Sequence, residues 1–346
     1  MGKAGDGTVR FGIVGCGTIA GFHARALARI PGAVLVGAAD AVPSAAEAFA
    51  AAHGVRSFAS PDALFASPDV DVACLCTPSG LHAPLGLAAA RAGKHLVVEK
   101  PVALSLADAD ALIAACAAAD LRLAVISQLR FSPAVRQLKA AVDRGAFGRL
   151  VLADLAMEYH RSQEYYDLGG WRGTWAMDGG GALMNQGIHG VDLLLHLCGP
   201  VRSVSARTAT LARRIEVEDT AVAAFDFANG AVGTLRAATS VWPGTPRRLA
   251  IRGDAGSAVL EEDRIALWDL KEPDGAPAPE VGRTDVGAAN DPAAIGIEGH
   301  VRQLSDMADA VREGRAPLVD GTEGRKAVAL VLACYRSSQE ARPVLL

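Results

Sequence analysis

The chain has 346 residues, of which 51% are hydrophobic, and its 34 basic and 38 acidic residues give a formal net charge of −4. This length allows two domains. The slightly acidic balance argues against a nucleic acid or an anionic membrane surface as a partner. No apolar run reaches the length of a membrane span, and the N-terminal residues lack the apolar segment of a signal peptide.

The six cysteines are scattered along the chain, and none forms a Cys-x-x-Cys pair. Several lie inside apolar runs, which is typical of buried, reduced thiols. We therefore expect a cytoplasmic protein without disulfide bonds or a membrane partner.

The first motif lies near the start of the chain, where a short apolar run ends in Gly15-Cys16-Gly17 and a helical pattern follows over 18–30. This strand–turn–helix context is the one that a dinucleotide fingerprint requires. Gly15 allows a tight turn, and Gly17 allows a pyrophosphate to approach the backbone. The helix that begins with Thr18 and Ile19 offers N–H groups and a partial positive charge to the phosphates.

A second apolar run, over 33–39, ends in Asp40. At this distance from the glycine loop an acidic residue can accept hydrogen bonds from the ribose hydroxyls of the adenosine. The residues that follow Asp40 include no arginine that would favour a 2′-phosphate. The sequence therefore predicts NAD rather than NADP.

Apolar strands and helical patterns alternate as far as Gln128. Strands are expected over 70–76, 95–98 and 122–127, and helices over 44–52, 61–66, 82–92 and from Ser105 onward. This alternation predicts a doubly wound parallel sheet, the Rossmann fold, in an NAD-binding domain over 8–128. Ligands bind beyond the carboxyl ends of such strands. We therefore predict cofactor contacts at Thr77, Pro78, His82, Glu99, Lys100 and Gln128.

Lys100 stands out because it follows a buried strand at the edge that faces the ligand. Pro101 comes next and restrains the backbone, whether the peptide bond between them is cis or trans. A lysine held beside a nicotinamide can polarise a hydroxyl or carbonyl oxygen and pass on a proton. We predict Lys100 as a catalytic residue.

The second half of the chain, over 129–346, contains a dense stretch between 164 and 192. Aromatic residues beside arginine and amides are typical of a sugar or nucleotide pocket, so we predict substrate contacts at Tyr166, Trp171 and Arg172. Asn185 and His189 are four residues apart, which would place them on one face of a helix that ends near Cys198. We predict both as catalytic and substrate-binding residues.

Three interpretations of His189 remain open on the residues alone. It can be a structural histidine, or a metal ligand together with Asp178, Asp192 and His196. It can also be a catalytic base, since its unperturbed pKa suits proton transfer near neutral pH. The four residues have no dedicated ligand spacing, so we favour the base and predict no metal.

The pattern after Val201 is typical of β-structure. Strands over 219–227 and 231–240 flank Asn229-Gly230, a strong hairpin signal, and two more are expected over 247–253 and 257–269. We predict an open antiparallel sheet whose uncovered face, with Val222, Ala224 and Leu235, forms a subunit interface. A long loop over 271–292 and two helices, over 298–312 and 322–339, complete an α+β domain.

Taken together, the Gly15 loop, Thr77-Pro78, Glu99-Lys100-Pro101, the glycine-rich helix with His189 and the segment Pro317-Leu-Val-Asp-Gly resemble the Gfo/Idh/MocA oxidoreductases. The resemblance covers nearly the whole chain. It implies a nicotinamide cofactor, hydride transfer at a secondary carbinol of a sugar or cyclitol, and Lys100 and His189 in the active site. It also implies dimers or tetramers built through the antiparallel sheet.

One position departs from the family pattern, because many members have an aspartate where this chain has Asn185. An amide cannot act as a general base at neutral pH, so Lys100 and His189 must move the proton. The segment around Asn185 looks like the branch that oxidises UDP-N-acetylglucosaminuronate at the sugar 3-position. The alternatives are an inositol or polyol dehydrogenase, a sugar reductase, and a non-catalytic NAD-binding regulator.

Overall fold

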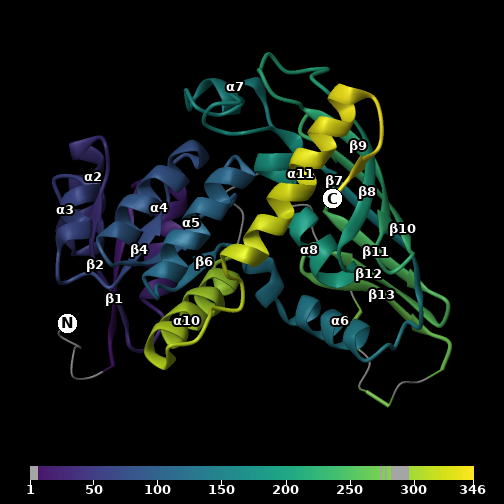
Figure 1. The fold of residues 1–346 in the computed structure, drawn as a ribbon, viewed down its shortest axis with the longest axis horizontal. Helices are drawn as coiled ribbons and strands as arrows, with labels where there is room; N and C mark the ends of the chain where they lie inside the picture. Colours follow the sequence, from purple (N-terminus) through teal and green to yellow (C-terminus); the bar gives the residue numbers. More distant parts are fainter. Residues whose placement is uncertain (1–6, 273–274, 277–278, 282–295) are drawn as a thin grey trace. The chain divides into compact units, whose positions relative to one another are not determined.

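The structure is a computed structural model that describes residues 7–272, 275–276, 279–281 and 296–346. The chain divides into two compact units. The first comprises Met1–Gln128 and Gly296–Arg325, and the second comprises Leu129–Ile295 and Lys326–Leu346. Figure 1 follows the chain from purple to yellow and labels most of the helices and strands named below.

The first unit is built on a six-stranded parallel sheet of order β3-β2-β1-β4-β5-β6. In this register Val14 at the end of β1 pairs with Ala39 of β2 and Leu75 of β4. The residues after these strands therefore lie at one edge of the sheet, as the predicted Rossmann fold requires. The strands are β1 (Val9–Val14), β2 (Ala33–Ala39), β3 (Arg56–Ser57), β4 (Val72–Leu75), β5 (His95–Val98) and β6 (Leu123–Val125).

The helices of this unit begin where the sequence predicts them. The Ser60 side chain accepts a hydrogen bond from the backbone of Ala63, and the Ser105 side chain accepts one from Asp108, so both serines cap helices. The helices are α1 (Thr18–Leu27), α2 (Pro43–His53), α3 (Pro61–Ala66), the short η1 (Ser79–Leu81), α4 (His82–Arg91) and α5 (Leu106–Ala118).

Helix α10 (Glu298–Glu313) also belongs to the first unit, although we expected residues 129–346 to form the second domain. Its buried residues Leu304, Met307 and Ala308 join the core made by β1 and α1. The sequence predicts the helix but not its location, because an apolar face does not reveal which surface it covers.

The second unit contains an eight-stranded sheet of order β13-β12-β11-β7-β10-β9-β8-β14. It is antiparallel except for one pair, since β7 and β10 run parallel. The predicted open antiparallel sheet is therefore a mixed one. Its strands are β7 (Leu150–Glu158), β8 (Val201–Ala209), β9 (Thr220–Phe227), β10 (Val232–Ala238), β11 (Arg248–Gly253), β12 (Gly256–Glu261), β13 (Arg264–Leu270) and β14 (Val344–Leu345).

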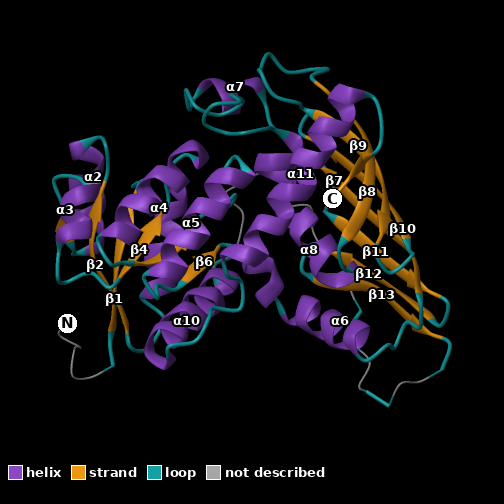
Figure 2. Ribbon diagram, in the orientation of Figure 1, coloured by secondary structure: helices purple, strands orange, loops and turns teal. Residues whose placement is uncertain are grey.

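Helices cover one face of this sheet, and in Figure 2 the described helices of the unit all lie on that side. Leu235 points toward them and is buried, so its predicted place on the uncovered face is wrong; Val222 and Ala224 do lie there. Successive side chains of a strand point to opposite faces of the sheet, so Val222 and Ala224 of β9 lie on one face and Leu235 of β10 lies on the other. The helices are the short η2 (Gln128–Phe131), which begins at the unit boundary, α6 (Pro133–Asp143), α7 (Gln163–Asp167), α8 (Ile188–Cys198) and α11 (Gly321–Glu340), which begins in the first unit.

The predicted hairpin at Asn229-Gly230 is confirmed, with Gly230 at a φ of 88° between β9 and β10. The single strand expected over 257–269 is wrong, because Glu262, at a φ of 49°, turns the chain between β12 and β13. Most of the expected loop over 271–292 lies outside the described residues. Among those that are described, no helix is both long and apolar enough to cross a membrane.

Candidate active site

The turn after β1 has room for glycine alone. Gly15 has a φ of +91°, and a Cβ added there would lie 2.8 Å from the backbone carbonyl of Cys76. An L side chain is disfavoured at this φ, and the neighbouring atoms are backbone that cannot rotate away. The sequence prediction of a tight turn at Gly15 is therefore confirmed by the geometry.

Gly17 and Thr18 are exposed at the N-terminus of α1. Gly17 is the N-cap without a side-chain cap, and a Cβ added to it would meet nothing within 4 Å. The first N–H groups of this helix therefore lack a side-chain cap, and such groups at a helix N-terminus can bind a pyrophosphate.

Asp40 supports the glycine loop directly. Its two carboxylate oxygens accept hydrogen bonds from the backbone N–H groups of Cys16, at 2.7 Å, and Val42, at 2.8 Å. A carboxylate has about four acceptor sites, so two hydrogen bonds leave capacity for ribose hydroxyls. Asp40 therefore both fixes the loop and remains suited to the predicted contact.

Two other strand-end residues carry polar atoms in need of a partner. Thr77 Oγ1 and Gln128 Oε1 are buried and have no hydrogen-bond partner among the described residues. Buried polar atoms are rarely left unpaired, so the unpaired ones mark where a ligand is expected. Together with Pro78, these residues and the loop of Gly15 fit a bound dinucleotide.

Lys100 is half-buried and follows β5, and the peptide bond between Lys100 and Pro101 is cis. The ring of His82 lies between two carbonyl oxygens, that of Pro101 at 2.7 Å and that of Thr77 at 3.0 Å. His82 therefore ties the segment after Lys100 to the end of β4. This contact suggests that His82 positions the cofactor site, whereas the sequence suggested that it touches the cofactor.

Glu99 is also turned inward. Its carboxylate accepts a hydrogen bond from His23 Nε2 at 2.8 Å, and both side chains are buried. This partner argues against a direct contact between Glu99 and the cofactor. His23, on α1, was not singled out from the sequence, because it is 76 residues from Glu99.

In the second unit, the segment that carries Asn185 is a π-helical turn, η3 (Ala182–Gly187), and α8 begins only at Ile188. The regular helix expected to carry both Asn185 and His189 is therefore a π-helical turn, which bonds from i to i+5, followed by an α-helix. Single π-helical turns occur frequently at functional sites. Asn185 is buried, and His189 is half-buried.

A buried carboxylate, Glu218, holds the start of this turn. It accepts hydrogen bonds from the backbone N–H groups of Gly181, at 3.0 Å, and Leu183, at 2.7 Å, and from the hydroxyl of Tyr335, at 2.9 Å. These three donors fix the backbone just before Asn185. Sequence reasoning missed Glu218 because it lies 33 residues beyond Asn185, next to a strand.

A second buried carboxylate contacts Asn185 itself. Asp178 Oδ1 accepts a hydrogen bond from Asn185 Nδ2 at 2.5 Å, and Asp178 Oδ2 accepts one from the backbone N–H of Gly173. Because the amide nitrogen donates to Asp178, the amide group of Asn185 has a fixed orientation. Asp178 thus positions the residue that replaces the family's aspartate.

The predicted substrate residues divide into two groups. Tyr166 is buried, and its hydroxyl donates to Thr239 at 2.8 Å, which argues against a contact with substrate. Its neighbour Tyr165 lies instead with Arg172, whose guanidinium carbon is 4.6 Å from the centre of the Tyr165 ring and 5.5 Å from that of Trp171.

Two further polar residues extend this group. The Tyr165 hydroxyl accepts a hydrogen bond from Gln186, whose amide oxygen accepts one from Arg161 at 3.0 Å. We call Arg161, Tyr165, Trp171, Arg172 and Gln186 the arginine–aromatic cluster. Sequence reasoning missed Arg161, since nothing in the local pattern distinguishes it from a surface arginine.

Two of the residues that could bind a metal together with His189 have other partners. Asp192 forms a buried ion pair with Arg130, with distances of 2.8 and 2.6 Å. Asp178 is bonded to Asn185 and Gly173. The geometry of these carboxylates favours positioning roles rather than metal ligation.

Family models match both units. Residues 9–127 match the model described as an oxidoreductase family with an NAD-binding Rossmann fold, and residues 135–259 match the GFO/IDH/MocA C-terminal domain. The chain belongs to the GFO/IDH/MocA oxidoreductase family. The resemblance inferred from the motifs is therefore confirmed.

Three relatives illustrate the range of this family. The WlbA dehydrogenase from Bordetella pertussis, solved with NADH and UDP-GlcNAcA, is 38% identical over 99% of this chain and 98% of its own, with a TM-score of 0.89. UDP-N-acetylglucosamine 3-dehydrogenase of Acidithiobacillus ferrooxidans is 30% identical over 94% of this chain and 95% of its own. Inositol 2-dehydrogenase of Rhizobium meliloti is 29% identical over 97% of this chain and 99% of its own.

These findings confirm the cofactor and the reaction class. The protein is an NAD-dependent oxidoreductase that acts on CH–OH groups of a sugar, a nucleotide sugar or a cyclitol. The unpaired polar atoms of Thr77 and Gln128, both in the first unit, are compatible with a bound NAD.

We expect Glu218→Gln to lower the free energy of unfolding by about 1–3 kcal/mol. A glutamine has one acceptor oxygen, and its NH₂ group would face N–H donors that the carboxylate now satisfies. Chemical denaturation would measure the change, with Glu47→Gln, on the exposed surface of α2, as the matched control. A change no larger than that of the control would contradict the role assigned to Glu218.

The wild type and the Glu218→Gln variant also test a pH dependence of stability. Burial raises the pKa of Glu218 above its ordinary value of 4.5, although the N–H groups of Leu183 and Gly181 and the Tyr335 hydroxyl oppose the shift. The folded protein therefore holds this proton more tightly than the unfolded chain, so its contribution to stability falls as pH rises above about 4.5. The stability of the wild type relative to Glu218→Gln should decrease between about pH 4.5 and neutral pH; an increase would contradict the assignment.

Proposed function

We propose that this protein oxidises the 3-hydroxyl of an acidic nucleotide sugar of the UDP-N-acetylglucosaminuronate type, with NAD as the oxidant. The observation that carries the proposal is the 38% identity, over 99% of the chain, to a dehydrogenase solved with NADH and UDP-GlcNAcA. The arginine–aromatic cluster supports it, because planar guanidinium groups suit carboxylates and phosphates and aromatic rings suit sugars and bases.

The proposed roles of the catalytic residues follow from their chemistry. Lys100 stabilises the negative charge that develops on the substrate oxygen, and His189 takes the hydroxyl proton. Asn185, oriented by Asp178, binds a substrate hydroxyl. NAD, when bound, supplies the hydride acceptor.

The proposed cofactor contacts are those of the glycine loop and the strand ends. The pyrophosphate binds at Gly15, Gly17, Thr18 and Ile19. The adenosine ribose binds at Asp40, and the remaining polar groups of the cofactor bind at Thr77 and Gln128. Since Asp40 would repel a 2′-phosphate, the protein should bind NADH more tightly than NADPH. Dissociation constants from fluorescence titration would test this, and tighter NADPH binding would refute it.

The substrate proposal is tested by a panel assayed with NAD at the absorbance of NADH. UDP-N-acetylglucosaminuronate should give the highest kcat/KM, and UDP-N-acetylglucosamine, which lacks the carboxylate, a lower one. A preference for myo-inositol or a free aldose would favour the polyol dehydrogenase. No reaction with any alcohol, despite normal NADH binding, would favour the non-catalytic regulator.

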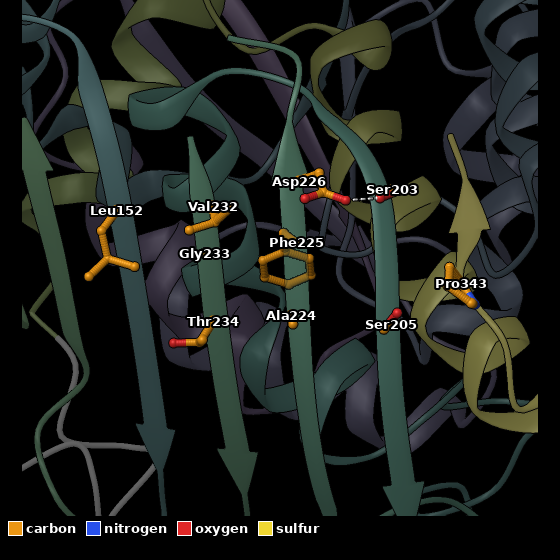
Figure 3. Close-up of a pocket in the computed structure, with 10 residues that line it drawn as sticks. All are labelled: Leu152, Ser203, Ser205, Ala224, Phe225, Asp226, Val232, Gly233, Thr234 and Pro343. Carbon is orange, nitrogen blue, oxygen red and sulfur yellow. Dashed lines mark hydrogen bonds between the residues drawn. The ribbon is translucent and has the colours of Figure 1, made fainter. Parts of the chain in front are cut away.

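We also propose that the uncovered face of the mixed sheet forms a homodimer or homotetramer interface. Leu152, Val222, Val232 and Leu267 on this face are 37–50% exposed, and exposed apolar patches mark interaction surfaces. A pocket of about 310 Å³ lies over β7, β10, β9 and β8, with Pro343 at its rim (Figure 3). Its floor is a flat sheet, which suits the surface of another subunit better than a small molecule.

We expect Val232→Glu to reduce the oligomer to monomers at micromolar concentration. The substitution would place a charge in the centre of the proposed interface, where it would be buried without a partner. Analytical ultracentrifugation would measure the mass, with Ser44→Glu, on the exposed surface of α2, as the control. A wild-type monomer, or an unchanged mass in the variant, would contradict the interface.

The unpaired state of all six cysteines supports a reducing, cytoplasmic location.

A further inference from the structure

Three ligand-type side chains meet in the core of the first unit. They are His23 on α1, Glu99 after β5 and His300 on α10, and they are 0%, 6% and 0% exposed. One nitrogen or oxygen atom of each lies within 4.8 Å of those of the other two. Among the described residues this is the one group of His, Cys, Asp and Glu side chains close enough to share an ion.

The two histidines have unused nitrogen atoms. Both ring nitrogens of His300 and Nδ1 of His23 are buried without a hydrogen-bond partner in the described part of the chain. The His23 and His300 ring centres are 5.5 Å apart. Leaving a buried nitrogen unpaired costs about 1–3 kcal/mol, so the unpaired nitrogens of His300, close to the buried pair of His23 and Glu99, indicate a missing partner.

We propose that His23, Glu99 and His300 bind one divalent cation of the zinc class. Two imidazole nitrogens and one carboxylate oxygen form a donor set that Zn²⁺ accepts, with water as a fourth ligand. Ligand atoms at about 2.0–2.1 Å from one tetrahedral ion are about 3.4 Å apart, so atoms that now lie up to 4.8 Å apart would have to approach by up to about 1.4 Å.

The protonation states fit this role near neutral pH. Burial raises the pKa of Glu99, but the hydrogen bond and charge of His23, with smaller effects from His300 and Lys100, outweigh it and lower the pKa to about 2. Burial, aided by the charge of His23, lowers the pKa of His300 to about 4. Glu99 is then ionised and His300 neutral, as metal ligands must be, and the ion would displace the His23 proton that Glu99 now accepts.

The cation would act as a structural clamp rather than in hydride transfer. It would tie together the helix that follows the glycine loop, the residue before Lys100, and α10. The inference does not depend on the proposed substrate, because all three ligands lie in the first unit and none belongs to the arginine–aromatic cluster.

The test uses the full-length protein freed of metal by a chelator and titrated with Zn²⁺ alone in a calorimeter. We expect one equivalent to bind and the melting temperature to rise. His300→Gln should weaken binding more than about 10-fold, as even loss of a residue that only supports a ligand does so. The control His53→Gln, on the exposed surface of α2, should bind like the wild type.

Co²⁺ provides a second measurement that does not depend on a variant's stability. Bound to the wild type, it should give visible absorption typical of nitrogen and oxygen ligands, without the charge-transfer band of a thiolate. A thiolate band, no stoichiometric Zn²⁺ binding by the wild type, or equal affinity in a folded His300→Gln would each overturn the proposal. If His300→Gln does not fold, Glu99→Gln replaces it with the same expectation.

Discussion

Lys100→Ala and His189→Ala should each lower turnover by about 10²-fold or more. We assign to Lys100 the positive charge beside the developing alkoxide and to His189 the role of proton acceptor, because Asn185 cannot act as a base. Initial rates with saturating NAD and the best substrate of the panel would measure the loss. If the two residues act on one proton, the double variant should lose much less than the product of the single effects.

Matched controls separate catalysis from folding. Lys271→Ala and His53→Ala remove the same side chains from exposed positions and should leave turnover within about 2-fold of the wild type. NADH should bind to His189→Ala with its normal dissociation constant. Near wild-type rates in both Lys100→Ala and His189→Ala, with normal NADH binding, would show that the assigned mechanism is wrong.

Gly15→Ala should weaken NADH binding by at least about 10-fold. The left-handed φ of +91° costs an L residue of the order of 1–3 kcal/mol, and the new Cβ would contact the Cys76 carbonyl at 2.8 Å. The loop must shift to relieve that contact, which moves the N–H groups of Gly17 and Thr18 away from the pyrophosphate. Fluorescence titration with NADH would measure the change.

Gly54→Ala is the control for backbone strain alone. Gly54 also has a left-handed φ, of +65°, but an added Cβ meets nothing within 4 Å, and the residue ends α2 away from the glycine loop. This variant should lose some stability yet bind NADH normally. Equal losses of affinity in Gly15→Ala and Gly54→Ala would mean that global destabilisation, rather than the loop, explains the effect.

Local chemistry explains which parts of the fold the sequence predicts. The Gly15 turn, the caps at Ser60 and Ser105 and the hairpin at Asn229-Gly230 depend on residues within a few positions of each other, and all are confirmed. The parallel pairing of β7 with β10 depends on strands far apart in sequence, and no short pattern specifies it.

The same distinction applies to the site. Asp40 and Thr77 follow apolar strands, so their place is readable from the chain. Asp178 orients the Asn185 side chain, and Glu218 fixes the backbone before it. The spacing of these residues in the sequence does not predict either role. The π-helical turn also has no signature in the sequence, because its wider spacing depends on the contacts that hold its start.

The position of α10 bears on how the protein forms during synthesis. Domains usually fold as they emerge from the ribosome, beginning with the N-terminal one. Here Leu304 and Met307 complete the core beneath β1, so the dinucleotide-binding unit has its whole core only after residues 296–325 have been translated. A nascent chain that stops before residue 296 would expose an unfinished apolar surface, which is the kind of surface that chaperones recognise.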